Sequence, residues 1–369
     1  MPRRRCLPSA MPDFPLPGAA ALAPLAEAAA RADELGGLQP GQLDLLHREG
    51  WLTLLAPRAV GGGEWPLPAI VRLEEAVAAA DGSCGWFLTL CAGAGWFAGF
   101  LPPELARDIL AAPRVCLAGS GAAGGWADRD GDGWRISGHW GHATGAPQAS
   151  HFTFNARLRE QGRPLLDALG QPRVRAFVVP ARDVQWQPSW HSIGLRASAS
   201  HAFGIDSAWA ADAQAFDIDP ARATAPGPLY RFPFRALALA TLAANLLGLA
   251  RHFMALAEPV VQARTTRRGD AGGAVLAGVQ AQHQALTQAR TAFYAALDDA
   301  WRRLDAGQPL EAGAAGPLEA ESFRLARTTR ELFAAAYPAC GLLAADPRSE
   351  LNRVWRDFHT ATQHALWMG

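Results

Sequence analysis

The sequence predicts an α+β protein in which helices, strands and helices again follow one another along 369 residues. Apolar residues recur at spacings of three and four up to about residue 112, short runs of strand type follow up to about residue 215, and helical spacing returns from Phe234. This segregated order argues against a doubly wound parallel sheet, in which strands and helices alternate. We expect an N-terminal helical domain, a central antiparallel β domain and a C-terminal four-helix bundle, over residues 19–113, 114–222 and 228–369.

The first part of the chain has the pattern of several helices joined by short loops. Leu73, Val77 and Ala80, for example, lie four and three residues apart and share one helical face. Glycines at 36–37 and 61–63 interrupt the pattern, so we expect loops there.

Short runs in the middle of the chain are apolar or alternate apolar with polar residues, which is typical of strands. An Asp-Gly step at 130–131 between two of the runs has the chemistry of a tight hairpin. The runs lie at 115–118, 134–140, 151–156, 174–179 and 201–206.

Helical spacing in the last part predicts four helices. The longest uncharged run, 15 residues between Arg235 and Arg251, is shorter than the roughly 18 residues that a membrane span needs. We therefore expect a helix buried on all sides, and no membrane partner. The predicted helices lie at about 234–263, 274–304, 318–336 and 350–366.

Composition excludes several classes of protein. Half of the residues are apolar and only 18% are charged, so the chain should fold around large buried surfaces and assemble. All 34 basic residues are arginines, and the absence of lysine rules out a Schiff-base lysine or a P-loop lysine. The 34 acidic residues bring the net charge to zero, which is not the electrostatic footprint of a nucleic-acid-binding protein.

Cysteine usage and the N-terminal sequence predict a cytoplasmic protein. The basic start at 1–5 is followed by several prolines, not by the unbroken apolar stretch of about 7–15 residues that a secretory signal needs. The true start is open between Met1 and Met11. The cysteines are odd in number and form no C-x-x-C pair, so we expect buried free thiols at positions 6, 84, 91, 116 and 340.

Several tempting motifs fail in their sequence context. The G-x-G-x-x-G at 119–124 leads into strand-like sequence, so no helix N-terminus is available to hold a pyrophosphate. The D-x-D-x-D-G at 128–133 is followed by His139 where a calcium loop needs its bidentate carboxylate. No metal site is expected, because the members of each histidine pair point in different directions, at 139 and 142 on a strand and at 359 and 364 on a helix.

Three further segments, taken in order, resemble the acyl-CoA dehydrogenase superfamily. The segment 134–146 is similar to the family's strand and turn in which a small hydroxyl residue before glycine faces the flavin ring. The segment 190–200 is similar to the family's W-x-x-x-G-L-R-x-T/S-x-S strand. The segment 353–364 resembles the C-terminal helix of its two-component FMN-dependent monooxygenases, relatives of 4-hydroxyphenylacetate hydroxylase and dibenzothiophene monooxygenase. The resemblance covers essentially the whole chain and implies an acyl-CoA dehydrogenase-like fold.

This resemblance implies a flavin-dependent monooxygenase. It would use O2 and reduced FMN, supplied by a partner flavin reductase, to hydroxylate an aromatic or polyketide-like small molecule. The catalytic residues would be His364, since an imidazole can donate or accept a proton near neutral pH, and Thr144 near flavin N5. Ala143, Thr144 and Gly145 would contact the flavin.

The resemblance also implies contacts at the flavin phosphate, at the substrate and between subunits. Arg264 and Arg267 would bind the phosphate, because a guanidinium group matches phosphate geometry and the chain has no lysine. Trp86, in the segment Asp81-Gly-Ser-Cys-Gly-Trp, would line the substrate side. The C-terminal helices would be shared in a homotetramer.

Other interpretations stay open. The same side chains also suit ordinary roles in a strand, a core, a helix cap or an exposed loop. An FAD-dependent acyl-CoA dehydrogenase is the first alternative, with FAD as the alternative cofactor, although the Glu-Gly-Thr of its catalytic base and its R-x-x-F-G segment are missing from the chain. A non-catalytic assembly protein with a decayed flavin site is the second, supported by Leu342 and Leu343 where the monooxygenases often carry a polar or basic residue.

Overall fold

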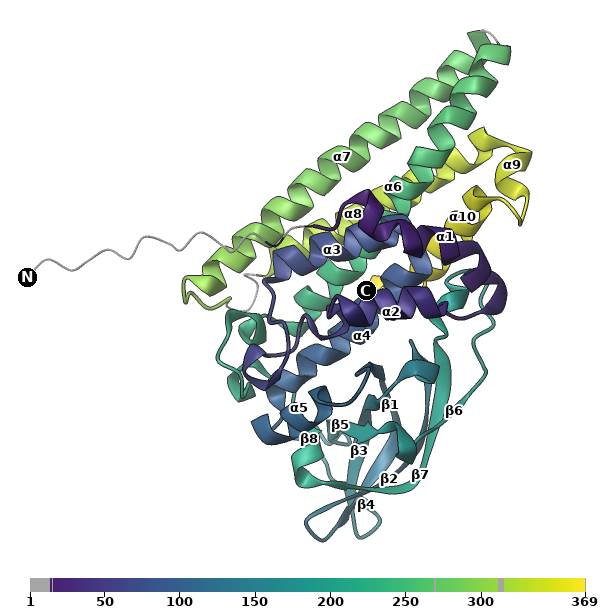
Figure 1. Ribbon diagram of the computed structural model, residues 1–369. Coiled ribbons are helices and arrows are strands. Elements are labelled where there is room, and N and C mark those ends of the chain that lie inside the picture. The colour runs from purple at the N-terminus through teal and green to yellow at the C-terminus, as the bar shows by residue number, and fades with distance from the viewer. Residues whose placement is uncertain (1–13, 15, 269, 311–314, 369) are drawn as a thin grey trace, which may run out of the picture.

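The helices gather at one end of the molecule and the sheet at the other. The computed structural model describes residues 14, 16–268, 270–310 and 315–368, with the backbone alone for 267–268 and 270–272. Figure 1 shows that two long helices, α6 (Phe234–Arg268) and α7 (Asp270–Asp305), project from the body as a hairpin pointing away from the sheet. One hydrophobic cluster lies within the sheet, and a larger one fills the helical part and includes the sheet residues Leu117, Val178 and Phe216.

The N-terminal helices begin and end where local chemistry dictates. Asp81 caps α4 by accepting a hydrogen bond from the Ser83 N–H. Gly36 ends α1 in the left-handed conformation (φ +69°), which glycine adopts without a Cβ penalty. The helices are α1 (Ala19–Leu35), α2 (Pro40–Arg48), α3 (Leu67–Ala80), α4 (Gly82–Gly95) and α5 (Pro103–Leu110).

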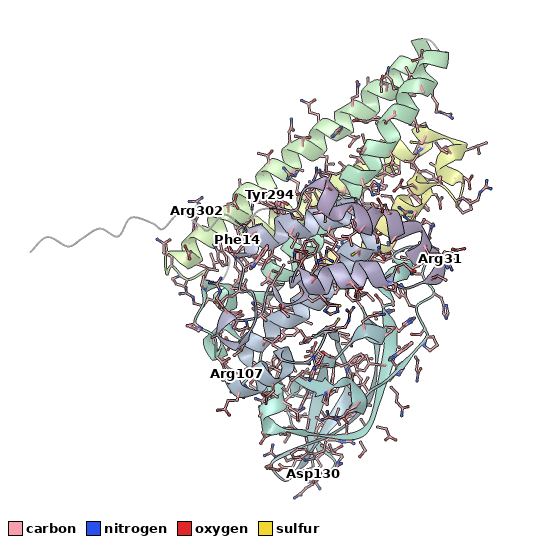
Figure 2. All side chains as sticks on the ribbon, viewed as in Figure 1. Phe14, Arg31, Arg107, Asp130, Tyr294 and Arg302 are labelled. Atoms are coloured by element: carbon pink, nitrogen blue, oxygen red, sulfur yellow. The ribbon has the colours of Figure 1, made fainter. Side chains whose placement is uncertain are left out.

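The strands form one sheet with the order β6-β7-β2-β1-β3-β5-β8 among the described residues, and β4 pairs with β3. The predicted hairpin joins Asp130 to Gly133, with Gly131 at φ +61°, and Figure 2 shows Asp130 at the tip of the sheet farthest from the helices. The strands are β1 (Leu117–Asp130), β2 (Gly133–Ala143), β3 (His151–Glu160), β4 (Arg163–Pro164), β5 (Val174–Pro180), β6 (Gln185–Gln187), β7 (His201–Ala211) and β8 (Ala215–Phe216).

The sheet is mixed, so the prediction of a purely antiparallel domain was wrong in one pair. Strands β1 and β3 run parallel, with Leu117 opposite His151. The β1–β2 hairpin brings the end of β2 back beside the start of β1, and the short connection 144–150 passes to the other side of β1. Strand β3 therefore starts next to the start of β1 and runs the same way.

The glycine-rich run at 119–124 lies inside β1, and no helix follows it. Its glycines make room for neighbouring side chains. A Cβ on Gly119 would lie 2.3 Å from the Thr153 Oγ1, and a Cβ on Gly124 would lie 2.8 Å from the Trp140 ring. Gly119 and Gly124 are thus needed for packing, whereas a Cβ on Gly121 would meet no atom within 4 Å.

The C-terminal helices are α6, α7, α8 (Gly316–Cys340), α9 (Leu342–Ala345) and α10 (Glu350–Ala361). The last helix ends five residues before the predicted Leu366. The Thr362 hydroxyl donates back to the His359 carbonyl, and the following N–H groups turn the chain into a short 3-10 helix, Ala365–Met368. The division into domains at 19–113, 114–222 and 228–369 stays a proposal.

Helix α6 is the central helix of the helical part. Residues Phe234–Thr266 are long and apolar enough to cross a membrane, but 83% of their most apolar window is buried inside the protein. Between α6, α3 and α7, the Glu75 carboxylate (1% exposed) binds Arg251 at 2.6 Å and Arg290 at 2.9 Å and accepts from the Tyr294 hydroxyl. Burial of this charge is tolerated because it is paired. As predicted, α6 is a core helix.

Close contact between α3 and α6 depends on Gly248. A Cβ there would lie 2.5 Å from the Glu75 carbonyl oxygen and 2.7 Å from the Ala78 Cβ. We expect Gly248→Ala to lower the free energy of unfolding by about 1–3 kcal/mol through overpacking. Gly278→Ala, on an exposed stretch of α7 with no atom within 4 Å of the new Cβ, should instead raise it by roughly 0.5–1 kcal/mol. Urea unfolding of both variants measures the difference, and equal effects would contradict the close contact.

Candidate functional site

The first predicted site segment ends in a corner after β2. The Thr144 side chain is buried (4% exposed). Its hydroxyl is hydrogen-bonded to the Ser200 hydroxyl at 2.8 Å, and the Ser200 hydroxyl is hydrogen-bonded to the Ser198 hydroxyl, also at 2.8 Å. The Gly145 N–H donates to the Ser198 carbonyl at 3.0 Å. Ala143, also buried, pairs with His201 at the start of β7. The corner is thus held by the second predicted segment.

The same corner docks on helix α4. The Cys91 thiol lies 3.6 Å from the Thr144 carbonyl oxygen. Gly145 has φ +72°, and a Cβ there would lie 2.7 Å from the Phe87 ring and 3.0 Å from the Cys91 sulfur. Only glycine therefore fits at this position, for both its backbone conformation and its contacts.

The second segment is held in turn by helix α10. The Leu195 N–H donates to the Asp357 carboxyl at 2.5 Å, and the Gly194 N–H donates to the Thr360 hydroxyl at 3.0 Å. A Cβ on Gly194 would lie 2.1 Å from the Arg356 carbonyl, so the two backbones touch. The segments 190–200 and 353–364, which the resemblance singled out separately, form one unit.

Two carboxyl groups, those of Asp81 and Asp357, are buried where α4 meets α10. Asp81, the cap of α4, also accepts from the Gln42 amide at 2.9 Å. A Cβ on Gly82, the residue after Asp81, would lie 3.1 Å from an Asp357 oxygen, so the Asp357 carboxyl group lies against the start of α4. Burial, together with the charge of Asp81, raises the pKa of Asp357 to about 8. Burial also raises the pKa of Asp81, against the opposing effect of Arg353.

His364 and Trp86 meet edge to face. Their ring centroids are 5.8 Å apart at an interplanar angle of 65°. His364 lies just beyond the end of α10, not on a helix as predicted, and its Nδ1 accepts from the Leu366 N–H at 3.3 Å. Burial lowers the pKa of His364 below its ordinary 6.5. The chain thus brings a neutral imidazole against the predicted substrate-side tryptophan.

Helix α4 connects these two places, because Trp86 and Cys91 are five residues apart on the same helix. Sequence reasoning assigned no role to Asp81, Ser198, Ser200 or Asp357. Asp81 precedes Gly82 at a helix start, which is an N-cap signal, and the other three lie within the segments that carry the resemblance. These four residues could have been identified from their positions in the sequence motifs. The proximity of Asp81 to Asp357, by contrast, has no local signal in the sequence.

Arg264 lies elsewhere, near the projecting end of α6. Its guanidinium group covers the backbone of Gly341 (φ +64°), where a Cβ would lie 2.4 Å from the Arg264 Nη1. No ion pair of Arg264 is found in the described part of the chain. It lines a pocket of about 310 Å³ with Val261, Thr265, Val275, Ala335, Pro338 and Ala339. The Arg267 side chain falls outside the described residues.

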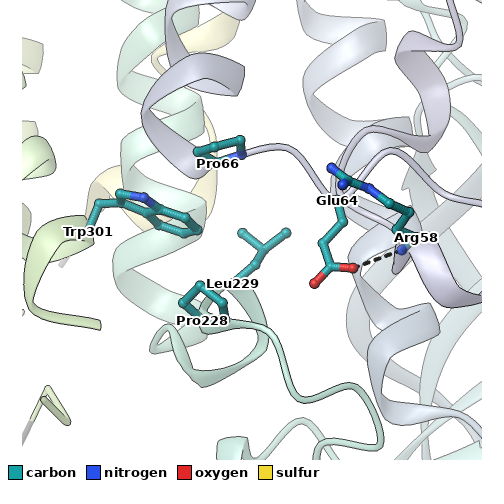
Figure 3. Close-up of a pocket in the computed structure, with 6 residues that line it drawn as sticks. All are labelled: Arg58, Glu64, Pro66, Pro228, Leu229 and Trp301. Atoms are coloured by element: carbon teal, nitrogen blue, oxygen red, sulfur yellow. Dashed lines mark hydrogen bonds between the residues drawn. The ribbon is translucent and has the colours of Figure 1, made fainter. Parts of the chain in front are cut away.

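A second pocket is unrelated to the predicted residues. Its volume is about 210 Å³, and Figure 3 shows it between the end of α7 and the short helix Pro228–Arg231, with the Glu64 carboxylate accepting from the Arg58 N–H at 2.9 Å. No group of three or more histidine, cysteine or acidic side chains able to hold a metal occurs among the described residues.

Comparison with known proteins identifies the fold. Residues 240–368 match the family model described as "Acyl-CoA dehydrogenase, C-terminal domain". The whole chain superposes on 3-HSA hydroxylase from Rhodococcus sp. RHA1 with a TM-score of 0.83 at 20% identity, covering 94% of this chain and 91% of that one. The chain has an acyl-CoA dehydrogenase-like fold.

Other solved structures with this fold contain flavin. XiaF from Streptomyces sp., in complex with FADH2 and glycerol, has a TM-score of 0.80 at 21% identity, covering 93% of this chain and 88% of that one. FMN-bound TdsC from Paenibacillus sp. A11-2 has a TM-score of 0.75 at 19% identity, covering 94% and 93%.

Two curated relatives are similar in sequence. The pigment production hydroxylase of Rhodococcus sp. is 28% identical over 271 residues, which is 70% of this chain and 67% of the relative. The indole-3-acetate monooxygenase of Pseudomonas putida is 25% identical over 329 residues, which is 88% of this chain and 82% of the relative.

The corner after β2 can both donate and accept a hydrogen bond. In the described structure, the hydroxyls of Thr144, Ser200 and Ser198 are joined by two hydrogen bonds, so one of the three O–H groups is left to donate beyond the chain of hydroxyls. Because the direction of such a chain can reverse, Thr144 can either donate or accept. This freedom suits the polar edge of a flavin ring, which carries both kinds of group.

The His364 ring should titrate below pH 6.5, because burial favours the neutral form and lowers its pKa. Protonation then favours the unfolded state, so stability contributed by neutral His364 should be lost as the pH falls below 6.5. NMR titration of His364 measures its pKa, and Trp86→Ala should return it toward 6.5 by letting water in. A wild-type pKa at or above 6.5 would contradict the buried position.

Proposed function

We propose that the chain is the oxygenase component of a two-component flavin-dependent monooxygenase, which hydroxylates an aromatic or polyketide-like small molecule. The observation that carries this is the meeting of His364 with Trp86 beside the helix on which the Thr144 corner docks. The curated relatives that span this chain are named as hydroxylases or monooxygenases. A monooxygenase is therefore favoured over an acyl-CoA dehydrogenase.

The proposed roles follow from the contacts. A bound reduced flavin supplies the electrons and activates O2. Thr144 would hydrogen-bond the flavin ring near N5, with Ala143 and Gly145 beside it. Neutral His364 would accept a proton from the substrate or orient it by a hydrogen bond. Trp86 would form the apolar wall of the substrate side and exclude water.

The cofactor is reduced flavin delivered by a separate flavin reductase. We propose FMN, with FAD as the alternative, since structures with this fold hold one or the other. The proposed location is the cytoplasm.

We further propose a homotetramer in which another subunit completes the flavin site. Figure 1 shows the last part of α6, where Arg264 lies, projecting away from the sheet, whereas Thr144 directly follows β2 and contacts α4, so one chain does not bring the two together. The surface near Arg264 is apolar, with Leu342 86% and Leu343 49% exposed. Burying these side chains against a second copy would place an unpaired arginine at a partner's flavin phosphate. Arg267 would assist it.

Reduced FMN, O2 and a panel of phenols and fused aromatics should yield a hydroxylated product in the presence of the protein. We expect His364→Ala to lose at least about 100-fold of product formation, as when a general acid or base is removed, while reduced FMN still binds. His283→Gln, on the surface of α7, is the matched control. Mass spectrometry of the product and anaerobic flavin titration provide the measurements. Full turnover by His364→Ala would remove this residue from the site.

The protein should elute near four times its monomer mass in light scattering. Replacing both exposed leucines, as in Leu342→Ser with Leu343→Ser, should shift it toward smaller species. Arg264→Ala should weaken reduced FMN binding by about tenfold through the loss of one charged phosphate contact, without changing the subunit number. A monomeric wild type, or unchanged flavin affinity in Arg264→Ala, would contradict the shared site.

A further inference from the structure

Asp81 and Asp357 lie at the contact of α4, α10 and the Leu195–Ser200 segment, which we call the joint. The predicted residues at the Thr144 corner, Trp86 and His364 are all attached to it. Asp357 binds the Leu195 N–H, and three residues later the chain reaches Ser198, which holds the Gly145 N–H and connects through Ser200 to Thr144. Asp81 caps α4, which carries Trp86. Asp357 itself lies on α10, two turns before His364. A movement at this joint would displace the flavin side, the substrate side and the imidazole together.

The residues around the joint are tightly packed. A Cβ on Gly82 would lie 2.5 Å from a Leu249 methyl group as well as against Asp357, and a Cβ on Gly194 would lie within the Arg356 peptide group. Asp357 is 1% exposed and Asp81 2% exposed, so water does not screen them. Side chains at this density cannot absorb a new charge by moving apart, because interiors are packed like crystals.

The charges that face Asp357 come from three directions. Asp81 approaches from the cap of α4 and Asp33 from α1, and both raise its pKa. Arg353, on α10 itself, opposes them, but its guanidinium is also bound to Glu350 at 2.9 Å. Asp33 is already paired with Arg356 at 2.7 Å. The surroundings therefore favour a protonated Asp357 beside Asp81.

We propose that Asp357, in its protonated form and close to Asp81, is the positioning residue that keeps the Leu195–Ser200 segment and helix α4 in register for flavin chemistry. This rests on the proposed monooxygenase function and adds a pH limit to it. When Asp357 loses its proton, two adjacent carboxylates repel each other in a dry space. The joint then loosens, and Thr144 loses its fixed direction.

The sign of the pH effect follows from the raised pKa. The native state keeps the Asp357 proton up to about pH 8, whereas the unfolded chain releases it near 3.8. The contribution of Asp357 to stability is therefore full at low pH and falls as the pH rises from about 4 to 8. Coupling of flavin oxidation to hydroxylation should remain high up to pH 7.5 and fall above pH 8.

The variant Asp357→Asn keeps the hydrogen bond to the Leu195 N–H but removes the ability of this side chain to ionise. The amide oxygen still accepts from the Leu195 N–H, and the NH2 group replaces the acidic O–H but cannot ionise. We expect the product formed per flavin oxidised by this variant to remain within about threefold of wild type at pH 7, and the fall in coupling above pH 8 to disappear.

Asp357→Ala leaves the Leu195 N–H unpaired and should lower product per flavin oxidised by about tenfold or more at saturating reduced FMN, because catalytic groups are misplaced. Asp217→Asn, an acid of the sheet edge paired with Arg222, is the control.

The experiment measures product and H2O2 per reduced FMN oxidised, and the melting temperature, from pH 6.5 to 9.5. The difference in melting temperature between Asp357→Asn and wild type should increase up to about pH 8 and then level off, a result that requires no activity.

Identical pH profiles of wild type and Asp357→Asn, or full coupling in Asp357→Ala, would overturn the proposal. If Asp357→Ala does not fold, the Asp357→Asn profiles still decide. If wild type forms no product, the proposed function fails, and the melting series still tests the joint.

Discussion

The hydrogen bond from the Leu195 N–H to the Asp357 carboxyl joins two segments that are 162 residues apart, and the candidate site is built outward from it. On one side it fixes the loop that holds Thr144 through Ser198 and Ser200. On the other side it belongs to the helix that leads to His364. Because Gly194 touches the backbone of α10 directly, no side chain lies between the two elements to adjust their distance.

Because the chain has no lysine, arginines supply every basic side chain in this structure. Arginines at the helix interfaces are mostly engaged by carboxylates, as Arg251 and Arg290 are by Glu75, and Arg356 is by Asp33. Arg264 has a pocket and a glycine backbone as neighbours instead. Among the described residues no carboxylate is paired with Arg264, so a phosphate can recruit its guanidinium group, and the chain offers no lysine as a substitute.

Sequence patterns were sufficient for the order of helices and strands, because periodicity is a local property. They could not specify the parallel pairing of β3 with β1, which depends on where the 144–150 connection crosses the sheet. They placed His364 on a helix, although the Thr362 hydroxyl and the turn after it end α10 earlier. No sequence pattern predicts that Asp81 lies near Asp357, because the two acids are 276 positions apart and belong to different motifs.

The use of these acids bears on the reaction itself. A dehydrogenase of this fold needs a free carboxylate to take a proton from carbon next to a thioester. Here one oxygen of Asp357 accepts from a backbone N–H, while Asp81 accepts from Ser83 and from Gln42, so both acids hold segments together. The group that faces the aromatic wall of Trp86 is an imidazole kept neutral by burial. A neutral imidazole in an apolar setting can orient or deprotonate a phenol-like hydroxyl near neutral pH but is a poor base for a carbon acid. The same contacts that build the site therefore favour hydroxylation over dehydrogenation.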